Sequence, residues 1–466
     1  MDLVELLTRP EGKTLEFKRD LSSPEGVLKT LVAFANTAGG TLLVGVEDRT
    51  RNVRGVPEAL DVEERIANIV SDSIAPRLLP EIELLPWRRT QVIAIQVHPS
   101  AARPHYLKRD GAESGTYVRV GSTNRRADAE MLQELRRSAR GETYDEQPMA
   151  DLDSEALDFR AASESFKPTR TLRKRDLESL RLLTTHQGHT VPTVGGVLLF
   201  GRDRERHFPD AWIQAGRFDG VDKSRILDRA ELRDLPVSAI EAAISFIEKH
   251  SLHGADIGRV RRTDRWALPP VAVREAMINA VVHADYAQRG APIRIAIFDD
   301  RLEIENPGLL PFGLTVEDIE RGISKLRNRV IGRVFHALGL IEQWGSGIQR
   351  MIAACREAGL ADPRFEEIAT RFRVTIFTSQ VNRPTLDDTD QVIVDVLSDG
   401  AGKLTSEIAV VIGLTSRATR TRLARLVGNG LVREVGSGPQ DPKRRYFIAR
   451  RRYGAATDER GRALIG

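Results

Sequence analysis

Apolar and polar residues in the first 135 positions alternate between helical and strand-like spacing, which is typical of an α/β domain. Apolar residues from Leu28 to Ala35 repeat at helical intervals, and Gly39 follows them as a stop signal. Uninterrupted apolar runs indicate buried strands. The pattern predicts helices at 27–38 and 62–74 and strands at 41–46, 91–97 and 116–120, in a domain that covers 1–137.

The middle of the chain has the pattern of two more units that mix helices and strands. Residues 138–168 are polar and acidic and predict a linker. We expect a connecting α/β domain at 169–268 and a further α/β domain at 269–378. The predicted strands are 194–200, 211–218, 293–298, 302–306 and 372–377, and the predicted helices are 236–250 and 271–284.

The C-terminal part predicts a small basic domain at 390–454, preceded by a polar linker at 379–389 and followed by a tail at 455–466. Helices are expected at 390–399, 405–412 and 416–428, then a strand, a basic turn and a second strand up to residue 448. From Ala401 to Gly454 there are 12 Lys and Arg against three Asp and Glu, although the whole chain carries only +4. Such a local excess attracts phosphate, and the alternative is a tail that is basic only for solubility.

Composition excludes several classes. Cys355 is the only cysteine, so an intrachain disulfide and a cysteine-based zinc site are excluded. The first residues include acids, unlike a secretory signal, and no run approaches 18 apolar residues. We therefore expect a cytoplasmic, multidomain protein of the α/β and α+β classes with no membrane contact.

The helix expected at 416–428 has two different faces. Ser416 is a candidate N-cap, and the inner side is predicted to hold Ala418, Leu423, Leu426 and Val427. The outer side would present hydroxyls and guanidinium groups, which bond phosphates and guanine edges. These residues are Arg417, Thr419, Arg420, Thr421, Arg422 and Arg425, with Lys443, Arg444 and Arg445 in the following hairpin.

Over about 60 residues this helix pair and hairpin resemble winged helix-turn-helix regulators. The resemblance implies double-stranded DNA as the partner, with the hairpin as the wing over flanking phosphate. A winged helix that is used for protein contacts is the alternative.

A second candidate site lies at 269–377. Glu275, Asn279 and His283 recur every four residues, so they share one face of the predicted helix. Polar groups in an otherwise apolar helix indicate a site, because burying them without partners is costly. Asn306 and Gly308 follow a predicted strand, and Gly345 and Gly347 open a helix, where backbone N–H groups can approach phosphate.

These ordered motifs resemble the GHKL ATPase fold of the gyrase, heat-shock chaperone and histidine-kinase type, in its RecG-like regulator branch. The resemblance implies a GHKL-like α/β sandwich that binds ATP and Mg²⁺. Asn279 would hold the metal, Glu275 would activate water, His283 would share the pocket, Asn306 and Gly308 would face adenine, and Gly345 and Gly347 would cradle phosphates. The family's adenine-reading Asp is replaced by Asn306, and the nucleotide lid is short. A degenerate fold with Glu275 and Asn279 bonded internally is the alternative.

The N-terminal domain carries a third set of motifs. Leu15-Glu16-Phe17-Lys18 and the stretch from Ala33 to Asp48, with its Gly39-Gly40 pair, resemble the Schlafen/AlbA type over about 115 residues. The resemblance implies nucleic-acid binding. Candidate backbone contacts are Tyr106, Lys108, Arg119 and Asn124.

Glu11, Glu16 and Asp48 have spacing similar to that of the Schlafen acidic triad. Three converging carboxylates would hold Mg²⁺ or Mn²⁺, which could activate water for attack on RNA or DNA with Lys18 near the phosphate. The alternative pairs Glu16 with Lys18 or an arginine. Our leading hypothesis is a homodimeric DNA-binding transcriptional regulator whose middle domain binds nucleotide. The rivals are a metal-dependent nuclease and a scaffold with both sites empty.

Overall fold

The computed structural model describes residues 1–48, 50–257, 262–342, 345–378, 386–429, 431–435, 441, 444–449, 456–457 and 463–464. The chain divides into two compact units. The first contains Met1–Ser100, His105–Arg126 and Asn382–Gly466, and the second contains Ala101–Pro104 and Ala127–Val381. None of the helices in the described ranges is long and apolar enough to span a bilayer.

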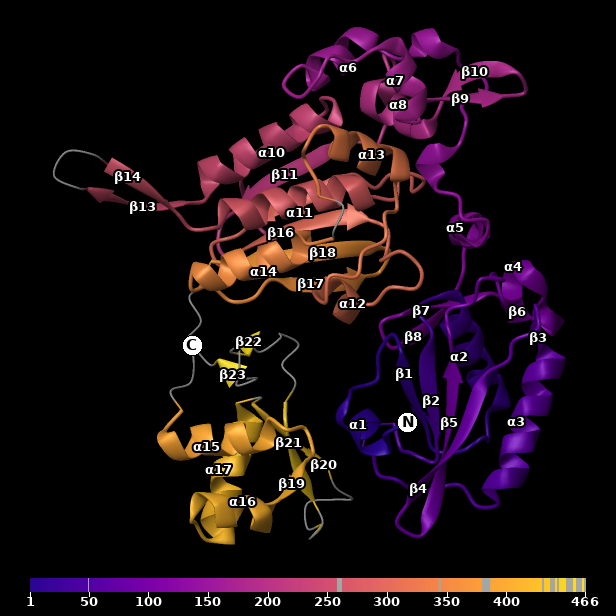
Figure 1. Ribbon diagram of the computed structural model, residues 1–466, viewed down its shortest axis with the longest axis vertical. Helices are drawn as coiled ribbons and strands as arrows, with labels where there is room; N and C mark the ends of the chain where they lie inside the picture. The colour runs from indigo at the N-terminus through magenta and orange to yellow at the C-terminus, as the bar shows by residue number, and fades with distance from the viewer. Residues whose placement is uncertain are drawn as a thin grey trace. The chain divides into compact units, whose positions relative to one another are not determined.

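A four-stranded sheet forms the centre of the N-terminal region (Figure 1). Its order is β1 (Leu15–Lys18), β2 (Gly40–Val44), β5 (Thr90–Val97) and β4 (Glu81–Trp87). Helix α2 (Pro24–Asn36) connects β1 to β2 and lets them run parallel. Helices α2 and α3 (Ala59–Ser73) pack on one face, and α1 (Leu3–Thr8) packs on the other. The predicted elements here, including β7 (Tyr117–Val120), are confirmed to within three residues.

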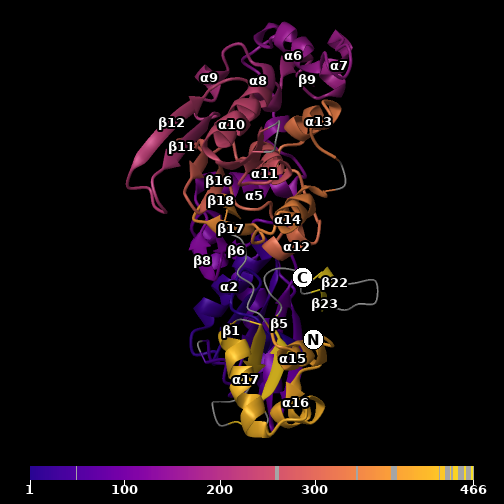
Figure 2. The same cartoon turned by 90° about the vertical axis from the view of Figure 1, so that its left-hand side faces the viewer.

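A six-stranded sheet forms the centre of the second unit. Its order is β12 (Ile226–Leu232), β11 (Ile213–Phe218), β15 (Ile293–Ile297), β16 (Arg301–Pro307), β18 (Arg371–Phe377) and β17 (Arg364–Ile368). Helices α10 (Pro236–His250), α11 (Pro270–His283) and α14 (Gly347–Glu357) lie side by side over one face, and Figure 2 shows the helices and the sheet as two layers. On the other face Glu303 and Glu305 pair with arginines of β18. This arrangement places α11 between α10 and α14, packed against β16 of the sheet.

Two predictions in the second unit are wrong. Residues 194–200 form helix α8 (Val194–Phe200) instead of a strand, because Thr193 caps its start and the whole run is buried. A fully buried apolar run carries no periodicity that separates helix from strand. The stretch 138–168 is also not an irregular linker, since it contains α6 (Phe159–Phe166) and two short 3₁₀ turns, and Phe166 enters the core of the unit.

The C-terminal segment has a core of its own. It consists of α15 (Asp388–Leu397), β19 (Lys403–Leu404), α16 (Thr405–Ile412), α17 (Ser416–Gly428), β20 (Val432–Val435) and β21 (Arg445–Ile448). The three strands form a sheet in the order β19-β21-β20. The three predicted helices and both strands are therefore present. The turn between the strands, most of the tail and 379–385 of the linker lie outside the described residues.

Candidate functional site

The polar face of α11 meets the start of α14. An ideal Cβ on Gly347 would lie 2.6 Å from Glu275 Oε2 and 3.7 Å from Asn279 Nδ2. Because glycine has no side chain, the first turn of α14 can rest directly against this polar face. Glu275, Asn279 and Gly347, which are far apart in the sequence, therefore lie together as the motifs predicted.

Glu275 is ion-paired in this arrangement. Its carboxylate lies 3.0 Å from Arg350 and 3.4 Å from Arg274, and only 5% of the residue is exposed. It also lies at the N-terminus of α14, where the helix dipole attracts negative charge. A protein carboxylate thus lies against the N-terminus of α14.

The loop after β16 is held against the end of α11. Asn306 Nδ2 donates to the Pro307 carbonyl at 3.0 Å and to the His283 carbonyl at 3.4 Å. Gly308 has a φ of +96°, and a Cβ there would lie 2.8 Å from Asp285 Cβ. Burial, together with the nearby Arg327 charge, lowers the pKa of His283 to about 4. The His283 imidazole is therefore neutral at physiological pH.

A loop at 322–328 joins these parts, and our sequence reasoning missed it. An ideal Cβ on Gly345 would lie 2.6 Å from Ser324 Oγ. Asn328 Nδ2 donates to the Val282 and Ala284 carbonyls at 2.9 and 2.7 Å, which ties the loop to the end of α11. Its sequence signal is composition: Arg-Gly-Ile-Ser-Lys-Leu-Arg-Asn-Arg, from 321 to 329, has four cations and no acid.

Arg327 holds the 322–328 loop in place through an ion pair and a hydrogen bond. Its guanidinium forms an ion pair with Glu134 of α5 (Ala129–Ala139) and donates to the Leu309 carbonyl at 2.5 Å. Asp285 lies 3.9 Å away. An ideal Cβ on Gly308 would be 3.3 Å from Arg327 Cζ. The side chain therefore supports the 306–308 loop and connects it to α5.

A second buried carboxylate holds the next helix, α13 (Arg329–Ala337). Asp145 accepts backbone N–H bonds from Arg329, Val330 and Ile331 at 3.0, 2.6 and 3.0 Å. Burial raises its pKa to about 6 although these donors favour the charged form. A residue of the predicted linker thus caps the helix that follows the 322–328 loop.

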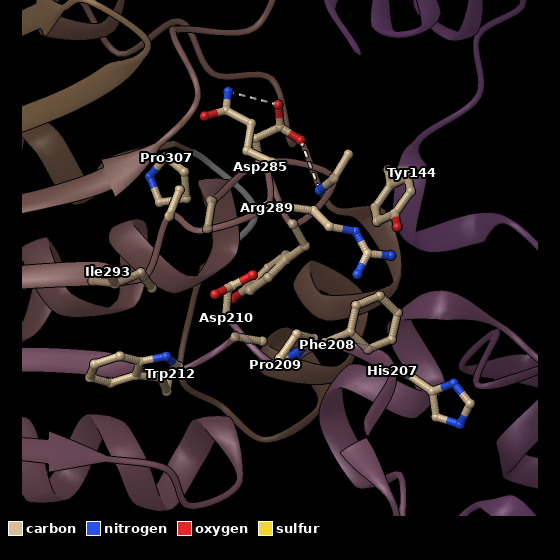
Figure 3. A pocket seen from close by; sticks show the side chains of 16 residues that line it. Tyr144, His207, Phe208, Pro209, Asp210, Trp212, Asp285, Arg289, Ile293 and Pro307 are labelled. Atoms are coloured by element: carbon tan, nitrogen blue, oxygen red, sulfur yellow. Dashed lines mark hydrogen bonds between the residues drawn. The ribbon is translucent and has the colours of Figure 1, made fainter. Parts of the chain in front are cut away.

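A small pocket lies at the C-terminal end of α11 (Figure 3). Arg289 and Tyr144 line one side, and Trp212, Ile293 and Pro307 line the other. Its volume of about 40 Å³ holds a few water molecules and no nucleotide. Glu275, Asn279 and Gly347 are not among its lining residues, so it is separate from the polar face of α11.

In the N-terminal domain, Glu16 is engaged by two cations. Lys18 Nζ lies 2.5 Å away, and Arg119 forms a buried ion pair with the other carboxylate oxygen. Glu11 accepts the Phe17 N–H at 2.8 Å, and burial, with the charges of Glu16 and Asp48, raises its pKa. The acids are thus close enough to interact, yet no group of three His, Cys, Asp or Glu in the described residues has the arrangement of a metal site.

The other predicted contacts of this domain differ in exposure. Arg119 is fully buried and donates to the Gly12 carbonyl and to Asn124 Oδ1, so its guanidinium is not available to a phosphate, and the half-buried Asn124 donates to Thr30 Oγ1 at 2.8 Å. Lys108 is exposed and donates to the Ser71 carbonyl at 3.0 Å, and Tyr106 is half-buried. Sequence alone did not separate the internal cation from the surface one.

Helix α17 presents only part of its predicted outer face. Thr419 is fully buried and donates to the Thr415 carbonyl at 3.0 Å, which corrects its assignment as a contact residue. Thr415, rather than Ser416, caps the helix, and Ala418 is exposed instead of buried. The cap lies one residue earlier than expected, and the apolar side contains only Leu423 and Leu426 as fully buried aliphatic residues.

Two acids at the start of α15, the N-cap Asp387 and Asp390, pair with the second half of this face. Arg422 lies 2.6 Å from Asp387 and 2.8 Å from Asp390, and Arg425 pairs with Asp390. Arg417 and Arg420, in the first half of α17, are exposed and have no ion pair with any described residue. Thr421, also exposed, donates to the Arg417 carbonyl at 3.2 Å.

The hairpin residues are partly engaged. Arg444 lies 2.6 Å from Glu434, and Arg445 is exposed and donates to the Gly402 carbonyl at 2.8 Å. Lys443 lies outside the described residues. The free cations of the segment's described surface are therefore concentrated on the first half of α17.

The fold and these sites define a multidomain, mixed α/β protein that combines a Schlafen/AlbA_2 domain with a RecG-like domain. Residues 11–128 match the family "Schlafen, AlbA_2". Residues 290–376 match the family described as "Putative ATP-dependent DNA helicase recG C-terminal". The two resemblances stated from sequence motifs are confirmed, although α11, with Glu275 and Asn279, precedes the second match.

Two solved structures are similar to the chain. The DIP2311 protein from Corynebacterium diphtheriae is 19% identical over 94% of this chain and 95% of that chain, with a TM-score of 0.45. The N-terminal domain of a "Putative ATP-dependent DNA Helicase RecG-related Protein" from Nitrosomonas europaea is 26% identical over 27% of this chain and 94% of that chain, with a TM-score of 0.23. No curated protein matches the chain. Because both TM-scores are below 0.5, the two family matches carry the assignment.

Proposed function

We propose that this chain is a DNA-binding transcriptional regulator whose RecG-like domain binds ATP. The C-terminal segment acts in this proposal as a winged helix, with α17 as the recognition helix and the β20–β21 hairpin as the wing. The observation that carries it is the exposed pair Arg417 and Arg420, which have no acidic partner among the described residues. Guanidinium groups near the start of a recognition helix are placed for guanine edges and phosphates.

The DNA-binding part is tested on α17. Arg417→Ala and Arg420→Ala are each expected to weaken binding of the full chain to duplex DNA by about tenfold, because each removes an unpaired cation. Arg425→Ala is the matched control on the same helix, and a change below about threefold is expected since Asp390 already neutralises that charge. Fluorescence anisotropy on duplexes selected from random sequence gives the affinities. Equal losses for all three variants would contradict the proposal.

Nucleotide binding is the second part of the proposal. The arrangement of Glu275, Asn279 and Gly347 supports it, because it brings the candidate catalytic carboxylate and the candidate metal-holding amide to the N-terminus of α14, where backbone N–H groups can hold a phosphate. MgATP at 100 times its Kd should stabilise the wild type by about 2.7 kcal/mol, because a ligand that binds only the folded state shifts the equilibrium. The melting temperature measures this shift. Asn279→Ala should remove the response, and no response in the wild type would end the ATP proposal.

A metal-dependent nuclease has less support. Glu16 already faces Lys18 and Arg119, so its charge is neutralised within the protein. The proposal also includes a homodimer that places two α17 helices on successive half-sites. Light scattering of the full chain measures the dimer directly.

A further inference from the structure

The 321–329 segment concentrates positive charge beside the candidate nucleotide site. Lys325 Nζ donates to the Phe312 carbonyl at 3.1 Å, and the Arg103 guanidinium lies over the Phe312 ring, 5.6 Å from its centre. Lys325 and Arg103 thus share Phe312 as a common support. Arg103 belongs to Ala101–Pro104, the short stretch that packs within the second unit.

Acids neutralise two other cations of this group. Arg327 pairs with Glu134, and Arg329 lies 3.5 Å from Glu146. Lys325 has no ion pair among the described residues, and its ammonium is partly buried against the Phe312 carbonyl although the residue as a whole is exposed. Burial of the ammonium and the charges of Arg103, Arg329 and Arg327 lower its pKa. Three arginines and one carboxylate, Glu134, thus act electrostatically on Lys325, and cations outnumber acids around it.

The position of Lys325 links this charge to the nucleotide site. Its neighbour Ser324 packs on Gly345, and an ideal Cβ on Gly322 would lie 3.1 Å from Gln349 Nε2 in the first turn of α14. Lys325 therefore directly follows, in the sequence, the residue that contacts Gly345 before the start of α14. Like charges are held together at a cost, and an anion bound between them would remove it.

We propose that Lys325 and Arg103 bind the phosphate oxygens of a polyphosphate chain whose other end is held at the N-terminus of α14. The inference rests on the proposed ATP binding and identifies cations that none of the recognised motifs contains. Because Arg103 directly precedes Pro104 and the first unit resumes at His105, an anion that moves Arg103 also moves the backbone that enters the first unit. A nucleotide bound at this site would therefore act, through Arg103, on the backbone that leads into the N-terminal domain.

Isothermal titration calorimetry of the full chain tests this site with two probes, MgATP and inorganic tripolyphosphate. Lys325→Met is expected to raise the Kd for both by at least about tenfold, because it removes a charged hydrogen bond to phosphate. Lys325→Arg should retain most of the binding. Arg321→Met is the matched control, since it removes an exposed cation of the same segment, and should change the Kd less than about threefold. The melting temperature of each variant without ligand shows that it folds.

The outcomes separate this inference from the proposed function. Wild-type binding of MgATP with an unchanged Kd in Lys325→Met overturns the phosphate site and leaves ATP binding intact. Tripolyphosphate binding that depends on Lys325, without MgATP binding, supports the anion site and overturns the ATP proposal. Binding of neither probe by the wild type overturns both. Loss of duplex DNA affinity in Lys325→Met, with tripolyphosphate binding unchanged, assigns the cation to DNA and also overturns the inference.

Discussion

Arg119→Met is expected to destabilise the N-terminal sheet by about 3–5 kcal/mol, the usual cost of breaking a buried ion pair. The Arg119 side chain is 1% exposed and pairs with Glu16. It also donates to the Gly12 carbonyl at 3.0 Å and to Asn124 Oδ1 at 2.9 Å. Methionine retains aliphatic packing against Phe34, over which the guanidinium lies. The variant therefore removes mainly the charge and its hydrogen bonds.

Hydrogen exchange of the full chain, followed by mass spectrometry, gives the free energy of opening for β1 and β2. A local measurement is needed because a chain of several units does not unfold in one step. Arg125→Met is the control, since Arg125 is an exposed arginine on β8 (Thr123–Arg126), and should change the opening free energy by less than about 0.5 kcal/mol. Similar protection in the two variants would show that the Arg119 pair contributes little.

The double variant Glu16→Gln with Arg119→Met identifies the cause of any loss of stability in Arg119→Met. Removing both charges should recover much of the stability, because the cost of the single variant comes from a buried carboxylate that has lost one partner. Lys18 at 2.5 Å remains as the second partner of Glu16 in the single variant. A double variant as unstable as Arg119→Met alone would assign the loss to the hydrogen bonds of Arg119 instead.

The sequence was sufficient to predict the helices and strands whose apolar residues have a regular spacing. Helix α11 and strands β15, β16 and β18 lie within two residues of their predicted bounds, because their apolar spacing matches one regular element. The shared face of Glu275 and Asn279 was also predictable, since helical geometry alone determines it. The same reasoning failed at 194–200, where every side chain is buried and no alternation exists.

Partners that are distant in the sequence could not be predicted in this way. Thr419 has a helical position that is compatible with either side of α17, and the packing of the helix against distant residues, which the local pattern does not contain, decides which side is buried. Asp387 and Asp390 lie more than 30 residues from the arginines that they hold. The role of 322–328 depends on Gly308 and Gly345 together, and no single motif contains all three.

Arg327→Met is expected to destabilise the second unit by about 3 kcal/mol and to abolish its response to MgATP. The substitution leaves Glu134 without its guanidinium, and the pair is well buried, with Arg327 8% and Glu134 22% exposed. It also removes the hydrogen bond to the Leu309 carbonyl and the support beneath Gly308. Both effects act on the loop that would face the adenine ring.

Glu134→Gln separates the loss of the ion pair from the loss of the Arg327 side chain that supports the loop. Its amide oxygen can still accept from Arg327, so a loss of only about 1 kcal/mol is expected. The 306–310 loop should then keep its shape and its nucleotide response. Arg321→Met, an exposed arginine near the same loop, is the control for removing one positive charge. Hydrogen exchange across residues 129–139 and 306–310 measures whether α5 and the loop open together.

Joint opening of α5 and the 306–310 loop in Arg327→Met, with neither opening in Arg321→Met, would show that the buried pair holds them as one element. The pair joins residues 193 positions apart, so a chance effect on both segments is not expected from a surface charge. Opening of the loop with α5 still protected would contradict this and restrict Arg327 to local support of Gly308.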